Sequence, residues 1–170
     1  MGAFTSELTI THLSGKDRHG WRFWRLAEPL IYEIGGPGSG RVIRVSKDFI
    51  TDGPSIPQFL WRILPVWASY SRAGVIHDYL CYLIADNTPH PEAPTRADAD
   101  RIFFEAMTAL NIGWVQKYAL YWGVCFATWL NLRTTMIDHN TTPNATQVVG
   151  LPPNYLRSVG GGVVVDHGGP

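Results

Sequence analysis

The stretch RAGVIHDYLCY, residues 72–82, places a histidine and an aspartate side by side in an otherwise apolar run. Helical spacing is predicted over residues 70–84. Because residues three and four apart share a face of a helix, His77 lines up with apolar neighbours, whereas Asp78 lies one step around. We therefore expect His77 to point inward.

A proline-rich loop separates this helix from the next one. The segment ADNTPHPEAPT, residues 85–95, holds three prolines in eleven residues and predicts a loop. A second helix is predicted over residues 96–110, antiparallel to the first. There Asp100 shares a face with Phe103 and Met107, and a buried carboxylate without a partner is costly. We expect a hydrogen bond between His77 and Asp100 across the two helices.

The rest of the chain completes one predicted domain, residues 1–135. The segments GWRFWRLAEPLIYEI (20–34) and GRVIRVSKDFIT (40–51) predict strands joined by a turn in GGPGSG, with Pro29 forming a bend or an edge. Further helices are predicted over residues 58–64 and 114–133. The expected fold class is α+β, with an N-terminal β-meander or hairpin (about 4–51) followed by a helical core (about 57–134).

Residues 136–170 are rich in glycine, proline and polar residues and predict an extended C-terminal arm. Within the arm, GGVVVD (161–166) has the character of a strand that would need a partner. Strand addition to a neighbouring subunit would satisfy its backbone. A flexible tail is the alternative.

Composition narrows the function classes. Lysine plus arginine and aspartate plus glutamate both number 14, which disfavours a nucleic-acid binder, and the seven tryptophans suit an interface protein. The two cysteines cannot form a disulfide framework, and the N-terminal sequence has no signal-peptide pattern. The longest apolar run, residues 118–130, is 13 residues long, short of the ~20 that span a bilayer. It predicts a buried core helix, with a membrane-surface helix as the alternative.

The predicted pair of His77 and Asp100 has a chemical interpretation. A histidine held by a buried carboxylate is a candidate general base. Asp78 is then free to bind a hard cation such as calcium, with oxygens from the loop TDGPSIP (residues 51–57), which includes Asp52 and Gly53. Together they would make an ester hydrolase. The alternative is a polar network that only braces the fold, in which Asp52 is a turn residue.

The residues His77-Asp78, followed by Ala99-Asp100-x-x-Phe103, resemble the viral and microbial phospholipase A-two pattern. The resemblance implies His77 as the base, Asp78 as a calcium ligand, Asp100 as the partner of the histidine and Gly53 in the calcium loop. The chain departs from that pattern in carrying Cys81 where the family has a tyrosine, and in having one glycine in the loop.

The segments FITDGPSIPQFLW, AGVIHDYL and ADADRIFFEAM also resemble a family of small proteins of unknown function carried by tailed phages and prophages. This resemblance implies a phage protein located in the virion or the host cytoplasm. We expect a calcium-assisted phospholipid hydrolase used in entry or lysis, acting at a membrane surface. The alternative is a non-enzymatic virion component that binds other phage structural proteins or itself through the C-terminal arm.

Overall fold

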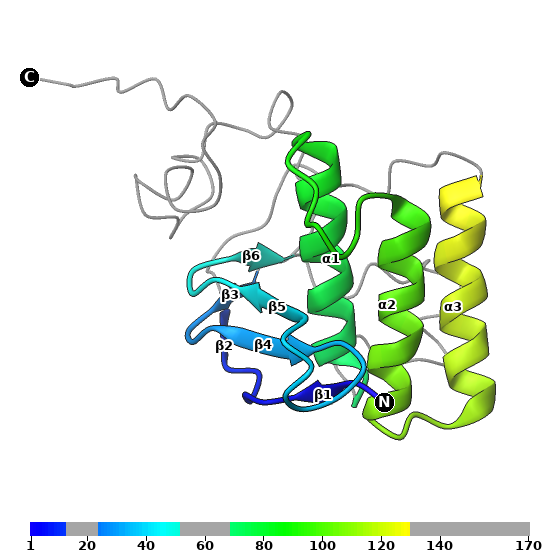
Figure 1. The fold of residues 1–170 in the computed structure, drawn as a ribbon, viewed down its shortest axis with the longest axis horizontal. Coiled ribbons are helices and arrows are strands. Elements are labelled where there is room, and N and C mark those ends of the chain that lie inside the picture. The colour runs from blue at the N-terminus through cyan, green and yellow to red at the C-terminus, as the bar shows by residue number, and fades with distance from the viewer. Residues whose placement is uncertain (13–23, 52–68, 130–170) are drawn as a thin grey trace, which may run out of the picture.

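The computed structural model describes residues 1–12, 24–51 and 69–129. Six short strands come first and three helices follow, which confirms the predicted α+β class. The helices lie beside the strands, and α3 is the helix farthest from them (Figure 1). The elements are β1 (Ala3–Phe4), β2 (Ile10–His12), β3 (Trp24–Leu26), β4 (Leu30–Glu33), β5 (Val42–Val45), β6 (Ile50–Thr51), α1 (Ser71–Ala85), α2 (Arg96–Ala109) and α3 (Trp114–Trp129).

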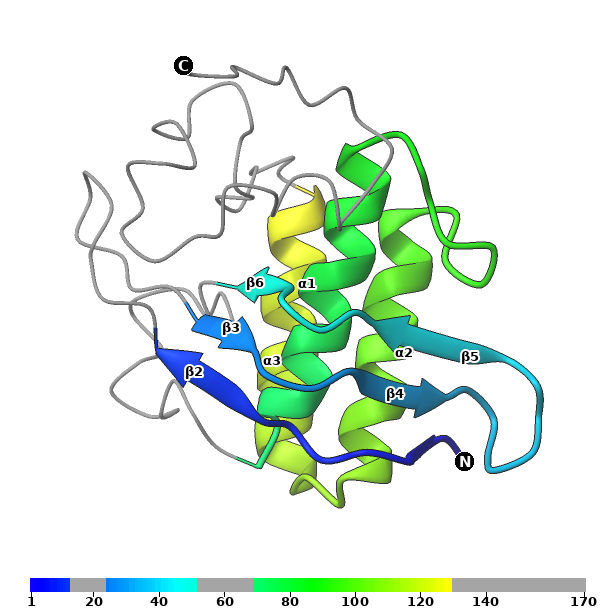
Figure 2. The ribbon, with the colours of Figure 1, turned by 90° about the vertical axis from the view of Figure 1, so that its left-hand side faces the viewer.

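The strands form two antiparallel three-stranded sheets, in the orders β1-β4-β5 and β2-β3-β6. Each predicted strand run is broken and contributes to both sheets (Figure 2). The first run breaks before Leu30, as expected from Pro29. The second breaks near Asp48, which has a left-handed backbone with φ 68.

Strands β4 and β5 form the predicted hairpin and supply much of the core. Leu30 pairs with Val45 and Tyr32 with Ile43, and all four side chains are buried. Their turn contains Gly35, with φ 82, a backbone conformation that strains residues with a Cβ atom. The glycine-rich segment therefore closes the hairpin as the sequence predicts.

Helices α1 and α2 are antiparallel, as predicted, and pack against each other (Figure 1). Thr95 caps α2 in a capping box: its Oγ1 accepts from the Asp98 N–H at 3.3 Å, and Asp98 Oδ2 accepts from the Thr95 N–H at 3.0 Å. Asp98 is also the acidic residue in the first turn of α2, where the helix dipole favours a negative charge. The capping box fixes where α2 begins, and with it the position of Asp100 on the inner face.

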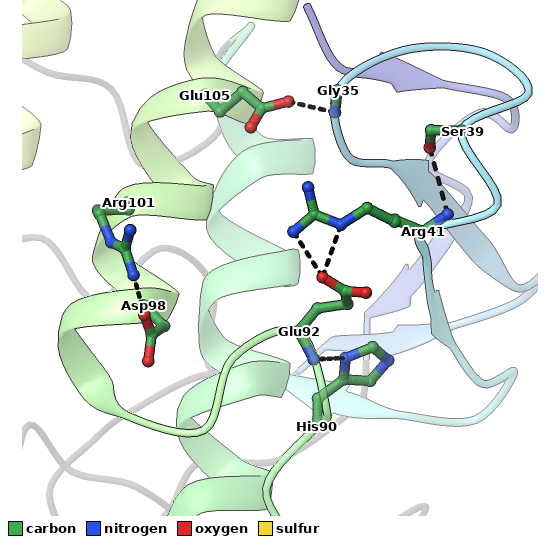
Figure 3. A network of polar contacts seen from close by, with 8 residues as sticks. All are labelled: Gly35, Ser39, Arg41, His90, Glu92, Asp98, Arg101 and Glu105. Atoms are coloured by element: carbon green, nitrogen blue, oxygen red, sulfur yellow. Dashed lines mark hydrogen bonds and ion pairs between the residues drawn. The ribbon is translucent and has the colours of Figure 1, made fainter.

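Polar contacts fasten the loop before α2 and the hairpin turn to the rest of the fold (Figure 3). Glu92 Oε2 accepts from Arg41 Nε at 2.8 Å, and Glu105 Oε1 accepts from the Gly35 N–H at 2.7 Å. The loop before α2 is thereby joined to the residue that precedes β5, and α2 itself to the hairpin turn. Both contacts hold α2 beside the hairpin.

Helix α3 packs on α2 and corrects one expectation. Its inner side contacts Phe104, whose ring centroid lies 5.0 Å from that of Tyr121. The outer side, however, is exposed, with Trp122 at 65%. The described part of the predicted buried core helix over residues 118–130 is therefore buried on one side only, because no described element covers the other.

Three of the expected elements lie wholly or partly outside the residues that the structure describes. They are the helix over residues 58–64, the part beyond residue 129 of the helix predicted over residues 114–133, and the C-terminal arm, residues 136–170. The division of the chain into residues 1–135 and an arm thus stays a prediction. Among the described helices, none combines the length and the apolar character needed to cross a bilayer.

Candidate functional site

The candidate site is built around a buried contact between His77 of α1 and Asp100 of α2. His77 Nε2 lies 2.8 Å from Asp100 Oδ1, and the two residues are 8% and 2% exposed. Each sits on the inner face of its helix, so the antiparallel packing brings them together. This confirms the contact that was predicted from their positions on apolar faces.

The second oxygen of Asp100 is held by the third helix. Thr128 Oγ1 of α3 donates a hydrogen bond to Asp100 Oδ2 at 3.1 Å. One carboxylate therefore joins all three helices. The sequence analysis missed Thr128, although a hydroxyl in the apolar run of α3 is the signal that could have found it.

The protonation state of His77 follows from its neighbours. Burial by itself lowers the pKa of His77. The electrostatic interaction with Cys81, the hydrogen bond with Asp100 and the charge of Asp78 outweigh burial and raise this pKa to about 10. At neutral pH the side chain is therefore an imidazolium whose Nε2 donates to Asp100. In the protonated form of His77, the contact with Asp100 is an ion pair.

Cys81 lies beside the imidazole ring and not in line with either nitrogen. Its Sγ is 3.6 Å from Nε2 and 3.9 Å from Nδ1 of His77. In a nucleophile–histidine–carboxylate triad the nucleophile and the carboxylate bind different ring nitrogens. Here the nearer nitrogen is the one already bonded to Asp100, so the geometry does not make Cys81 a nucleophile.

The donor to the second oxygen of Asp100 is a hydroxyl from α3, and not a side chain at position 81. The phospholipase resemblance implies a tyrosine at position 81, whose hydroxyl would hydrogen-bond to Asp100. Cys81 offers only a weak S–H donor. The Thr128 hydroxyl, from a different helix, supplies a donor to the same carboxylate.

Asp78 lies on a different side of α1 and contacts the strands. Its Oδ2 accepts a hydrogen bond from Thr51 Oγ1 of β6 at 2.9 Å. Burial raises the pKa of Asp78 to about 6, against the opposing effects of His77, the Thr51 hydrogen bond and Arg96. The carboxylate is therefore only partly compensated by the positive charges around it.

The remaining predicted metal ligands, Asp52 and Gly53, lie outside the described residues. Within residues 1–12, 24–51 and 69–129, no three His, Cys, Asp or Glu side chains gather into a possible metal site. Thr51, however, directly precedes Asp52 in the chain. Its bond to Asp78 brings the start of the TDGPSIP segment to this carboxylate.

The fold and site thus define an α+β protein in which a buried histidine–aspartate pair joins its helices. Residues 24–124 match the family described as protein of unknown function (DUF1353). Because the match covers more than half of the chain, the chain belongs to this family. The expectation of a family of unknown function is confirmed, and the phage origin stays a prediction.

One relative is the uncharacterized protein y4jT of Sinorhizobium fredii (strain NBRC 101917 / NGR234). The chain is 40% identical to it over 76 residues, which cover 43% of this chain and 20% of the relative. The chain thus spans only a minor part of that protein's length. No solved structure matches the chain.

Proposed function

We propose that the protein is a hydrolase of carboxylic esters, with phospholipids as its substrate class. The observation that carries the proposal is the 2.8 Å contact between His77 Nε2 and Asp100 Oδ1, beside the partly compensated carboxylate of Asp78. A histidine held by a carboxylate is suited to general-base chemistry. Perturbed pKa values in adjacent groups are typical of functional sites.

In the proposed reaction Asp100 positions the base. Because it occupies Nε2, only Nδ1 of His77 remains to accept a proton, and this requires the deprotonated imidazole. The oxygen of water attacks the ester carbonyl carbon while its proton passes to Nδ1. The ester C–O bond then breaks, and the departing alcohol takes a proton back from the imidazolium. Asp100 stabilises the imidazolium between these steps.

Asp78 is the proposed anchor for a calcium ion. Its undercompensated carboxylate fits a hard cation, and Asp52 and Gly53 of the adjoining segment are the other proposed sources of oxygen ligands. When bound, calcium would supply polarisation of the ester carbonyl. Thr51 donates a hydrogen bond to Asp78 and thereby orients the Asp78 carboxylate.

The setting proposed for this activity is a bacteriophage. It rests on the resemblance of the TDGPSIP, HDYL and AD-x-x-F segments to proteins of tailed phages and prophages. The protein would then act in the virion or in the host cytoplasm, on a phospholipid membrane surface during entry or lysis. Proposed partners are other phage structural proteins, or a copy of the chain bound through the C-terminal arm.

The test is fatty-acid release from phosphatidylcholine–phosphatidylglycerol vesicles by the full chain with calcium. His77→Gln keeps a donor toward Asp100 but removes the base, so activity should fall by about 100-fold or more. The matched control is His12→Gln, which changes an exposed histidine on β2. Absence of hydrolysis by the unmodified chain, or full activity in His77→Gln, would refute the proposal.

A second candidate is a non-enzymatic virion component, favoured by the way one buried carboxylate joins α1, α2 and α3. In this case the pair only braces the fold. His77→Gln would then lower the melting temperature without any activity to lose, and the protein would be found in purified particles as a structural part.

A further inference from the structure

Helix α3 has an outer face made of apolar side chains. Of the α3 side chains that the structure describes, every exposed one is apolar. We call these the α3 face: Trp114, Val115, Tyr118, Ala119, Trp122, Phe126 and Trp129. Soluble monomers rarely expose so large a contiguous apolar surface, and such patches mark interaction sites.

The size of this face suits a specific interface. Its five aromatic side chains are between 47% and 76% exposed. At about 150–250 Å² for a whole aromatic side chain, their exposed part is on the order of 600 Å². A standard protein–protein interface buries roughly 800 Å² on each partner, so the α3 face would supply most of one side.

The order of residues on the face is symmetric about Trp122. Tyr118 and Phe126 lie four residues to either side of it, and Val115 and Trp129 lie seven residues to either side. All five positions share one side of a helix. If a second α3 lay antiparallel across the first, Trp122 would meet its own copy and Tyr118 would meet Phe126. A two-fold interface needs such a self-complementary patch.

The charge of α3 favours a second copy of the chain over a membrane surface as the partner of this face. Lys117 is the only charged residue in α3, and it faces α2: its Nζ donates to Thr108 Oγ1 at 3.1 Å and lies 4.9 Å from the centre of the Phe104 ring. Helices that lie on anionic membranes carry lysine and arginine along their polar side. Apart from Lys117, α3 has no such cation on any side, and the lack of charge on the α3 face also lets two copies approach without repulsion.

We propose that two copies of the chain pair through the α3 face, with the helices antiparallel and the two-fold axis beside Trp122. The proposal is independent of ester hydrolysis, because none of the face residues belongs to the His77 site. Aromatic side chains at the centre of an interface typically contribute most of its binding energy. Trp122 would be the central contact of this dimer.

The first test is sedimentation velocity of the full chain over a wide range of concentration. We expect a dimer in the unmodified protein and a monomer in Trp122→Glu, which places like charges at the axis. Circular dichroism checks that this variant stays folded, as expected for a side chain that is 65% exposed. The matched control is Val42→Glu, an exposed apolar position on β5, which should remain a dimer.

Cysteine pairing tests the orientation, in a Cys125→Ser background. Trp122→Cys should form a disulfide with its own copy. Tyr118→Cys and Phe126→Cys should link to each other in a mixture and not to themselves. Self-linking of Tyr118→Cys would indicate parallel helices and overturn the proposal.

Two other outcomes would also overturn it. One is a monomer at every concentration, as expected if residues 130–170 of the same chain cover the face. The other is a monomer that binds phosphatidylglycerol vesicles through Trp122, which would assign the face to a membrane.

Discussion

Thr128 and Asp100 are hydrogen-bonded at 3.1 Å between α3 and α2, so the carboxylate that engages His77 is also the attachment point of the outermost helix. Asp100 is 2% exposed, and each of its oxygens accepts from a different helix. A buried carboxylate oxygen without a donor is costly. The bond from Thr128 therefore matters for stability as well as for the orientation of Asp100.

Thr128→Val should lower the free energy of unfolding by about 1–3 kcal/mol, because it removes this donor while nearly keeping the shape of the side chain. Thr128→Ser retains the hydroxyl and should recover part of the loss. Urea unfolding measures both. Thr88→Val, at an exposed hydroxyl bonded to Asp86, is the control and should change stability by less than about 0.5 kcal/mol. Equal effects at the two threonines would contradict this role for Thr128.

Asp100→Ala should be more damaging, at about 3 kcal/mol or more, since it leaves an uncompensated imidazolium in the core. Asp100→Asn keeps an acceptor for His77 and should cost less. Thermal and urea unfolding of the two variants give the comparison. An unchanged melting temperature in Asp100→Ala would show that the contacts of Asp100 with His77 and Thr128 do not stabilise the fold.

Stability should fall as the pH rises above neutrality. The pKa of His77 is raised to about 10 in the folded protein, from about 6.5 in an unfolded chain. A raised histidine pKa contributes stability that is fully present below about pH 6.5 and is lost as the pH approaches 10. Urea unfolding between these values should show a steeper decline in the unmodified chain than in His77→Gln. Parallel curves would mean that His77 is not protonated in the fold.

Calcium at millimolar concentration should raise the melting temperature by mass action, if Asp78 binds the ion with oxygens of the adjoining segment. The rise should vanish in Asp78→Asn and persist in Asp86→Asn, which changes the carboxylate at the C-cap of α1. Thermal unfolding with and without the metal decides this. An identical shift in all three proteins would assign the effect to another part of the chain.

The contact between His77 and Asp100 could be predicted because two local patterns converged. Each residue is polar on an apolar helix face, and the proline-rich loop between the helices makes them antiparallel neighbours. The bend at Pro29 was predictable for a similar reason, since proline cannot continue a strand ladder. These features depend on neighbours along the chain.

Features that depend on distant elements were not predictable in the same way. The division of each strand run between two sheets depends on pairing partners, such as Trp24 with Thr51, that sequence periodicity does not identify. Thr128 required knowing the rotation of α3 against α2. The burial of residues 118–130 was overestimated because hydrophobicity indicates that a surface tends to be covered, and not whether its own chain covers it.

The shared carboxylate of Asp100 also has a consequence for cooperativity. Unfolding of α3 alone would break the hydrogen bond from Thr128 to Asp100, and unfolding of α1 alone would separate His77 from Asp100. Local unfolding of either helix near these residues is therefore costly. The three helices should therefore behave as one unit in native-state hydrogen exchange. Amides near His77, Asp100 and Thr128 should exchange with similar opening free energies, and Asp100→Ala should split them into separate groups.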